Sequence, residues 1–219
     1  MTTIVCFGDS NTWGCEPRTD LSLPPARHPR GDRWPDVLAA YLGDGISVIA
    51  EGLNGRTTCF DDPIEGEDRN GRRSLLPCLE THHPVDLVII MLGVNDLKVR
   101  FAATAPTIAA GAAALAATAA ASGFGPPGRP PAVLLIAPPP TRVGEVDRYL
   151  GHFAGADERS AGFAESFRSA AGLAGVHFLD AGAHIESSER DGIHLETDAH
   201  HRLGAAIAEW ISATLDFER

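Results

Sequence analysis

The sequence predicts an α/β protein, a three-layer α/β/α sandwich whose central parallel sheet has about five strands, as in flavodoxin-like folds. Short runs rich in Val, Ile and Leu alternate with segments of helical periodicity, an order that favours right-handed strand–helix–strand units. These runs are apolar on both faces, which is typical of parallel strands covered by helices on both sides. The 219 residues, 44% of them hydrophobic, suit a single domain, 1–219, with a sizeable core.

The expected elements follow one another in a regular order. Strands are predicted at residues 4–7, 47–50, 87–92, 133–137 and 176–179. Helices are predicted at residues 34–42, 75–82, 106–121, 158–174 and 198–215. Gly43 ends the first helix, Pro77 weakens the second, and Asp198 is the expected N-cap of the last.

Three connections are long or rich in Gly and Pro, at residues 16–32, 123–131 and 138–157, and the last of them carries Tyr149, His152 and Phe153. Long loops in compact domains often act as lids or binding loops, although solvated connectors or subunit contacts explain them equally well.

Charge and cysteine content exclude several classes of function. The net charge of -11 argues against nucleic acid or an anionic membrane as the main partner, because both require basic patches. The four cysteines include no CxxC pair, which disfavours a zinc or redox site. Neither a signal peptide nor a membrane-spanning stretch is evident. We therefore expect a cytoplasmic protein with free thiols.

The residues that carry chemistry lie far apart in the sequence, each at the edge of an expected element. Ser10 follows the first strand through Gly8 and Asp9, and Asp191 precedes His194 by three residues near the other end. A serine hydroxyl becomes a nucleophile when a base accepts its proton and a third group orients that base. Ser10, His194 and Asp191 are therefore the predicted catalytic residues, although each motif alone is an ordinary turn or surface pair.

Two further turns can supply donors to a developing oxyanion. Gly55 follows the second strand and Asn95 follows the third, and the carboxyl ends of parallel strands share one edge of the sheet. The backbone N–H groups of Ser10 and Gly55 and the Asn95 amide are the expected oxyanion hole. Asp9 and Asp96 are expected to fix turns.

The histidine pairs His82-His83 and His200-His201 raise the alternative of a metal site. Adjacent residues of a helix diverge, and no carboxylate or thiol is expected at ligand spacing. We therefore predict neither a metal nor another cofactor.

The four blocks around Ser10, Gly55, Asn95 and His194 together resemble the SGNH hydrolase superfamily, also called GDSL esterases and lipases. In the resemblance these residues match the motif serine, glycine, asparagine and histidine, with Asp191 as the acid. Finer strings at residues 6–14, 51–53, 56–58, 86–93 and 191–194 are similar to its bacterial arylesterase and acyltransferase branch. Asn11 stands where the name GDSL has leucine, and we expect this difference to have little effect on the chemistry.

The residue chemistry and the resemblance both predict a two-step acyl transfer through an acyl-enzyme. The resemblance further implies a serine esterase that hydrolyses small aryl or acetyl esters, with acyl transfer to alcohols as a further capacity. Acetyl-carbohydrate esterase, thioesterase and lysophospholipase activities remain open. A flavodoxin-like nucleotide or phosphate binder is disfavoured because no glycine-rich phosphate loop is present. A binding module with a decayed site is disfavoured because every required group is present.

The substrate pocket is expected to include Trp13, Lys98, Phe153 and Ile193, which lie just beyond a motif or on a loop near the rim. Local packing explains Trp13 and Ile193 equally well. The partner is expected to be a small-molecule ester. The resemblance also implies a homo-oligomer in which loops of neighbouring subunits narrow the site.

Overall fold

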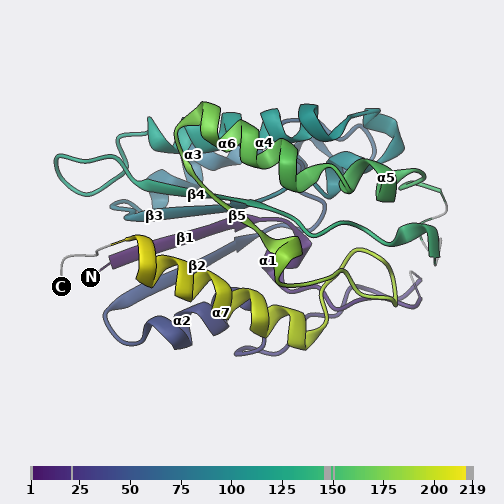
Figure 1. The fold of residues 1–219 in the computed structure, drawn as a ribbon, viewed down its shortest axis with the longest axis horizontal. Coiled ribbons are helices and arrows are strands. Elements are labelled where there is room, and N and C mark those ends of the chain that lie inside the picture. The colour runs from purple at the N-terminus through teal and green to yellow at the C-terminus, as the bar shows by residue number, and fades with distance from the viewer. Residues whose placement is uncertain (1, 21, 146–148, 150, 216–219) are drawn as a thin grey trace.

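The computed structural model describes residues 2–20, 22–145, 149 and 151–215 (Figure 1). Five parallel strands form one sheet in the order β2-β1-β3-β4-β5. The strands are β1 (Thr2–Gly8), β2 (Ile46–Gly52), β3 (Leu87–Met91), β4 (Ala132–Ala137) and β5 (His177–Asp180). The chain moves from β1 to β2 on one side and then to β3 on the other, so the order reverses around β1. Ligands of open α/β sheets bind at such a reversal, beyond the carboxyl ends of the strands.

Helices cover both faces of the sheet, which confirms the predicted three-layer architecture. Figure 1 shows α2 (Trp34–Leu42) and α7 (Thr197–Thr214) on one face, and α3 (Gly71–Thr81), α4 (Ala105–Ala120) and α6 (Phe163–Ala174) on the other. Each face has its own core. Ile4 and Cys6 of β1 pack with Trp34 and Leu203 on the first face, and Phe7 packs with the second. Alternate residues of a strand point to opposite faces, which is why β1 is apolar throughout.

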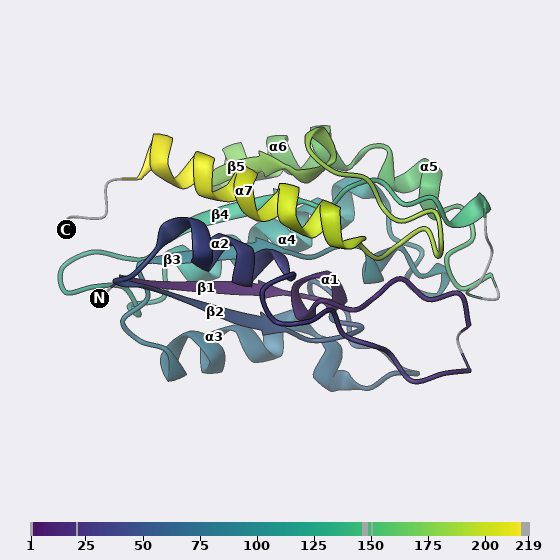
Figure 2. The same cartoon turned by 90° about the horizontal axis from the view of Figure 1, so that it is seen from below.

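Shorter elements connect these layers. They are the helices α1 (Ser10–Trp13) and α5 (Ala156–Ser160), and the 3₁₀ turns η1 (Glu67–Arg69), η2 (Asn95–Leu97), η3 (Val99–Phe101), η4 (Val143–Glu145) and η5 (Ala181–Ala183). None of the described helices is long and apolar enough to cross a membrane. Figure 2, seen from below, shows α3 along the β2 side of the sheet and α2 lying between α7 and β1.

Two of the predicted helices differ from those in the structure. The helix expected over residues 158–174 is two helices, α5 and α6, separated at Ala161 and Gly162. The break leaves the Ser160 hydroxyl as the acceptor for the backbone N–H of Thr141, 2.9 Å away. Helix α3 begins four residues earlier than expected, because the Asn70 side chain accepts from the N–H of Arg72 and caps it. Pro77 is tolerated inside this helix.

Asp198 is not the N-cap of α7, which was a wrong prediction. The cap position belongs to Glu196, and its side chain makes no capping hydrogen bond. The Glu196 carboxylate instead accepts from Arg190 and from the Ser188 hydroxyl. Asp198 lies in the first turn of the helix and pairs with Arg202 at 3.3 Å.

Candidate active site

Ser10 is presented by a tight turn at the carboxyl end of β1. The strand ends at Gly8, and a methyl group at that position would overlap the Thr12 side chain. The buried Asp9 then caps α1 by accepting from the backbone N–H of Asn11 at 3.0 Å. Glycine and a short capping residue therefore let the strand pass directly into a helix whose first residue is Ser10. This agrees with the expectation that Asp9 fixes the turn.

His194 lies between Ser10 and Asp191 within hydrogen-bonding distance of both. Its Nε2 is 3.1 Å from the Ser10 hydroxyl oxygen, and its Nδ1 is 2.7 Å from Asp191 Oδ2. Because a carboxylate can only accept, Nδ1 carries the hydrogen and Nε2 is free to accept the serine proton. The three side chains come from opposite ends of the chain and are all buried. The structure thus brings together the three predicted catalytic residues.

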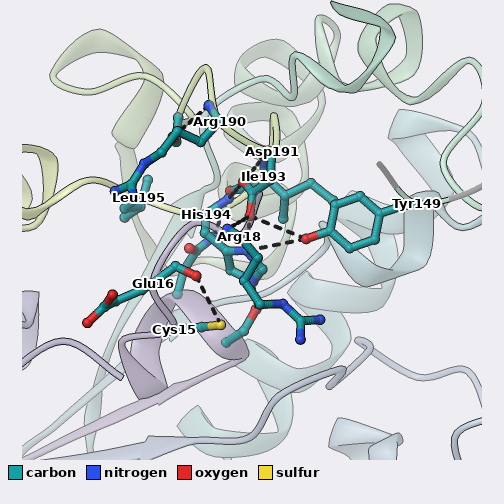
Figure 3. A network of polar contacts seen from close by, with 12 residues as sticks. Cys15, Glu16, Arg18, Tyr149, Arg190, Asp191, Ile193, His194 and Leu195 are labelled. Atoms are coloured by element: carbon teal, nitrogen blue, oxygen red, sulfur yellow. Dashed lines mark hydrogen bonds and ion pairs between the residues drawn. The ribbon is translucent and has the colours of Figure 1, made fainter. Parts of the chain in front are cut away.

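The Asp191 carboxylate is held by several donors besides the imidazole. Its Oδ1 accepts from the backbone N–H groups of Ile193, at 3.1 Å, and His194, at 2.9 Å. Its Oδ2 accepts from the Arg18 backbone N–H at 2.8 Å and from the Tyr149 hydroxyl at 3.3 Å. Figure 3 shows the Tyr149 hydroxyl directed at Asp191 and His194. Both long loops, 16–32 and 138–157, therefore contact the same carboxylate.

The two predicted oxyanion turns also reach this edge of the sheet. Gly55 has φ 80°, in the left-handed region that favours glycine. The Asn95 amide donates to the backbone oxygen of Arg56 at 3.1 Å and leaves its second N–H for the site. Arg56 in turn donates to the backbone oxygen of Gly8 at 2.7 Å. These bonds connect the Gly55 turn, the Asn95 turn and the end of β1.

Asp96 holds the Asn95 turn in place through hydrogen bonds with Thr58. Both carboxylate oxygens of this buried residue accept from the Thr58 backbone N–H at 3.1 Å, and Oδ1 also accepts from the Thr58 hydroxyl. Burial raises the pKa of Asp96 to about 7, and the Thr58 bonds oppose that rise. Asp96 is therefore part of the support for Asn95 and does not reach the cavity, as its predicted turn role implies.

A cavity of about 310 Å³ opens beside Ser10, and Gly55, Asn95 and His194 line it. Of the four predicted pocket residues, Lys98, Phe153 and Ile193 line the cavity. Trp13 is not among the described residues that do so, and its ring lies under the guanidinium of Arg27 at 4.6 Å. Sequence reasoning missed a set of polar and aromatic lining residues, namely Cys15, Arg18, Glu65, Arg69 and Tyr149.

Lys98 reaches the cavity as part of an ion-pair cluster. Its buried ammonium group is 2.5 Å from Glu65 and 3.5 Å from Asp62, and Arg100 contacts the same two carboxylates. Glu65 also lies against the α-carbon of Gly55, where a side-chain methyl would collide with it. The cluster therefore covers the Gly55 turn and places the Glu65 carboxylate, ion-paired with Lys98 and Arg100, beside it.

Comparison with known proteins agrees with this geometry. A model of the GDSL-like lipase/acylhydrolase family matches residues 6–202. The chain belongs to this family. Its fold is that of the SGNH hydrolases, and the protein is a carboxylic ester hydrolase. A search of curated proteins found no match.

Solved structures with 38–40% identity extend the likeness over almost the whole hydrolase chain. Est24, described as a carbohydrate acetylesterase from Sinorhizobium meliloti, is 40% identical with a TM-score of 0.91, and the match covers 98% of this chain and 100% of that one. The M. smegmatis aryl esterase is 39% identical with a TM-score of 0.90 over the same shares. A putative arylesterase from Agrobacterium tumefaciens is 40% identical with a TM-score of 0.86, again over 98% and 100%.

The charge state of the hydrolase site follows from the coupling of Asp191 with His194. Burial alone would lower the pKa of His194, but the hydrogen bond and charge of Asp191, with a smaller contribution from Cys15, raise it. Burial would likewise raise the pKa of Asp191, and the hydrogen bond and charge of His194 hold it below its usual range. The pair thus favours a carboxylate beside an imidazole that accepts protons readily.

One prediction about metal ligands needs correction. The expectation that no thiol or carboxylate lies at ligand spacing from the histidines is wrong for His82. Cys78 lies four residues before it on α3, and Glu51 of β2 is within 4.8 Å of both donor atoms. The helical spacing was visible in the sequence, but the approach of Glu51 depends on how α3 packs against the sheet.

Proposed function

We propose that this hydrolase cleaves small carboxylic esters through an acyl-enzyme on Ser10. The observation that carries the proposal is the continuous contact from the Ser10 hydroxyl to His194 Nε2, 3.1 Å, and from His194 Nδ1 to Asp191, 2.7 Å. A buried serine aligned with an oriented base is the arrangement that activates a hydroxyl for attack. The adjoining cavity of about 310 Å³ suits a small ester.

In the first step the Ser10 oxygen attacks the ester carbonyl while His194 Nε2 takes the hydroxyl proton. Asp191 holds the imidazole in position and stabilises its protonated form. The carbonyl oxygen becomes negative and accepts hydrogen bonds from the N–H groups of Ser10 and Gly55 and from the Asn95 amide. Collapse of this intermediate expels the alcohol, which leaves with the proton carried by His194.

The second step releases the acyl group from Ser10. His194, now neutral again, takes a proton from water, and the resulting oxygen nucleophile attacks the acyl carbonyl. The same three donors hold the second tetrahedral intermediate, and His194 returns its proton to the Ser10 oxygen. An alcohol in place of water gives a new ester, so acyl transfer uses the same groups as hydrolysis.

A panel of p-nitrophenyl esters tests the proposal and measures the acyl length that fits. We expect turnover of the acetate to exceed that of long-chain esters, because the cavity is small. Ser10→Ala should abolish turnover, and an organophosphonate should add its mass at Ser10 only. Folded protein that turns over none of these esters would instead support a binding module. Repeating the panel with an added alcohol measures the ratio of acyl transfer to hydrolysis.

Acetylated carbohydrate is a second candidate substrate, and the cavity lining favours it. Arg18, Glu65, Arg69 and Lys98 line the site together with apolar groups, and side chains of this kind can hydrogen-bond sugar hydroxyls. Est24 of Sinorhizobium meliloti, as a carbohydrate acetylesterase, belongs to the same substrate class. Acetate release from an acetylated sugar, compared with release from phenyl acetate at equal concentration, distinguishes the two candidates by kcat/KM.

A further inference from the structure

A second cluster of reactive side chains lies outside the catalytic cavity, between the edge strand β2 and α3. It contains Glu51, Cys78 and His82, whose carboxylate oxygen, thiol sulfur and imidazole nitrogen all lie within 4.8 Å of one another. His82 Nε2 and Glu51 Oε1 are already 2.7 Å apart. These three groups are a soft thiol donor, an intermediate imidazole donor and a hard carboxylate donor, and they lie close enough to bind one metal ion.

The fold places these donors in a fixed arrangement. Cys78 and His82 are separated by one helical turn at the end of α3 (Gly71–Thr81), so their side chains lie on the same face. Glu51 is paired in register with Phe7, and both belong to the face of the sheet that α3 covers (Figure 2). The His82 and Glu51 side chains are 21% and 35% exposed, so an ion can enter from solvent.

We propose that Glu51, Cys78 and His82 form a binding site for a zinc-like divalent cation, with water as the fourth ligand. Zinc takes thiolate, imidazole and carboxylate ligands in tetrahedral geometry at about 2.0–2.3 Å. Ligands at those distances stand roughly 3.3–3.8 Å apart, a spacing that small side-chain rotations reach from the present arrangement.

The charges near the cluster are compatible with a dication. Arg56 is a cation close to the cluster: it stacks on Phe7 at 4.0 Å and donates to the backbone oxygen of Glu51. The Glu51 carboxylate and a Cys78 thiolate together neutralise the two charges of the ion. Arg56 would therefore face a site without net charge. Binding displaces the thiol proton, which is released to solvent.

A bound ion would join α3 to the end of β2, just before the turn that carries Gly55. The expected effect is on the stability of this edge of the sheet, because no group of the cluster lines the catalytic cavity. The inference is independent of the proposed esterase mechanism, and its test does not use activity.

Cobalt(II) reports the site directly, because a cobalt–thiolate bond produces a charge-transfer band in the near ultraviolet. Reduced, chelator-treated protein should bind one equivalent of Co²⁺ with this band, and Zn²⁺ should displace it. Cys78→Ser should remove the band. Cys59→Ser is the matched control, since Cys59 is also a free, half-buried cysteine, and it should retain the band.

His82→Gln supplies a second variant that keeps a side-chain donor for Glu51. It should weaken Co²⁺ binding at least tenfold, and Zn²⁺ should raise the melting temperature of the unsubstituted protein but not of this variant. The inference is overturned if the unsubstituted protein gives no cobalt–thiolate band. It is equally overturned if the band survives in Cys78→Ser or disappears in Cys59→Ser.

Discussion

The side-chain amide of Asn11 donates to the backbone oxygen of Ile193 across a distance of 3.3 Å. Asn11 follows the expected nucleophile, and Ile193 precedes the expected base. This bond therefore connects the turn that presents Ser10 with the turn that presents His194, two segments from opposite ends of the chain. Asn11 stands where the name GDSL has leucine. A leucine side chain could not donate this hydrogen bond.

Asn11→Ala should lower both stability and turnover. The Ile193 oxygen would be left buried without a donor, which costs about 1–3 kcal/mol in the free energy of unfolding. The His194 turn would be held less firmly. If this raises the activation free energy by about 1.4 kcal/mol, kcat on a small aryl ester should fall about tenfold. Thr104→Ala is the control, because it removes the cap of the remote helix α4 and should affect stability alone. Equal kcat in Asn11→Ala and Thr104→Ala would show that the bond does not position the base.

The pH dependence of kcat/KM should reflect the raised pKa of His194. The neutral imidazole is the form that accepts the serine proton, so activity is lost as the pH falls through this pKa. Because Asp191 raises it, the acid limb should have its midpoint above 6.5, the ordinary value for histidine. Asp191→Asn should move the midpoint downward and reduce kcat roughly 10⁴-fold. A midpoint below 6 in the unsubstituted enzyme would contradict the assigned coupling.

Tyr149→Phe should move the acid limb of the kcat/KM profile to higher pH, opposite to the shift expected for Asp191→Asn. The Tyr149 hydroxyl donates to Asp191 at 3.3 Å and so shares the negative charge that stabilises protonated His194. Removing it leaves more of that charge for the imidazole, and the acid limb should move to higher pH. Activity should then fall more at pH 6 than at pH 8. The phenyl ring preserves the edge contact with Phe153, so the substitution removes the hydroxyl alone. An acid limb that does not move would contradict the charge-sharing role of this hydroxyl.

The residues whose chemistry requires a particular side chain were accessible to sequence reasoning. Ser10, His194 and Asp191 stand at strand ends or turns, and few other residue types perform their tasks. The parallel sheet and the two helical layers followed from the apolar runs for a similar reason, because parallel strands must be covered on both faces. The order of the strands within the sheet was not predicted. Helix ends were less accessible, since Glu196 and Asp198 differ in role only through their partners in space.

Contacts made by loops could not be predicted from the sequence. Arg18 supports Asp191 through its backbone N–H, a group that nearly every residue possesses. His28 ties the same loop to the Leu195 backbone oxygen at 3.0 Å, again without a motif. Trp13 follows a motif closely, yet α1 directs it toward Arg27. Position beside a motif does not determine the direction of a side chain.

Asn95→Ala should cripple turnover with a modest effect on stability. Loss of one oxyanion donor costs about 10²–10³ in kcat, while loss of the bond to the Arg56 oxygen costs roughly 1 kcal/mol in the free energy of unfolding. Asn54 lines the same cavity and has no expected place in the oxyanion hole. Asn54→Ala is therefore the matched control and should stay within a few-fold of full activity. Near-full activity of Asn95→Ala on phenyl acetate would refute the oxyanion assignment.

Lys98→Met should reduce kcat through the charge of Glu65. Lys98 and Glu65 are 2.5 Å apart, and Glu65 lies against Gly55. Without the ammonium group, Glu65 would keep only its ion pair with Arg100, and more of its charge would oppose the negative charge that develops beside Gly55 during attack. Loss of this charged contact should also cost about 2 kcal/mol in the free energy of unfolding.

The double variant Lys98→Met/Glu65→Gln separates charge from packing, because it removes the anion together with its partner. If the electrostatic reason is correct, the double variant should recover most of the kcat lost in Lys98→Met, and the two substitutions should be strongly non-additive in a double-mutant cycle. Additive losses would mean that Lys98 acts on the cavity by itself, as a contact for the substrate, and that Glu65 does not govern the oxyanion site.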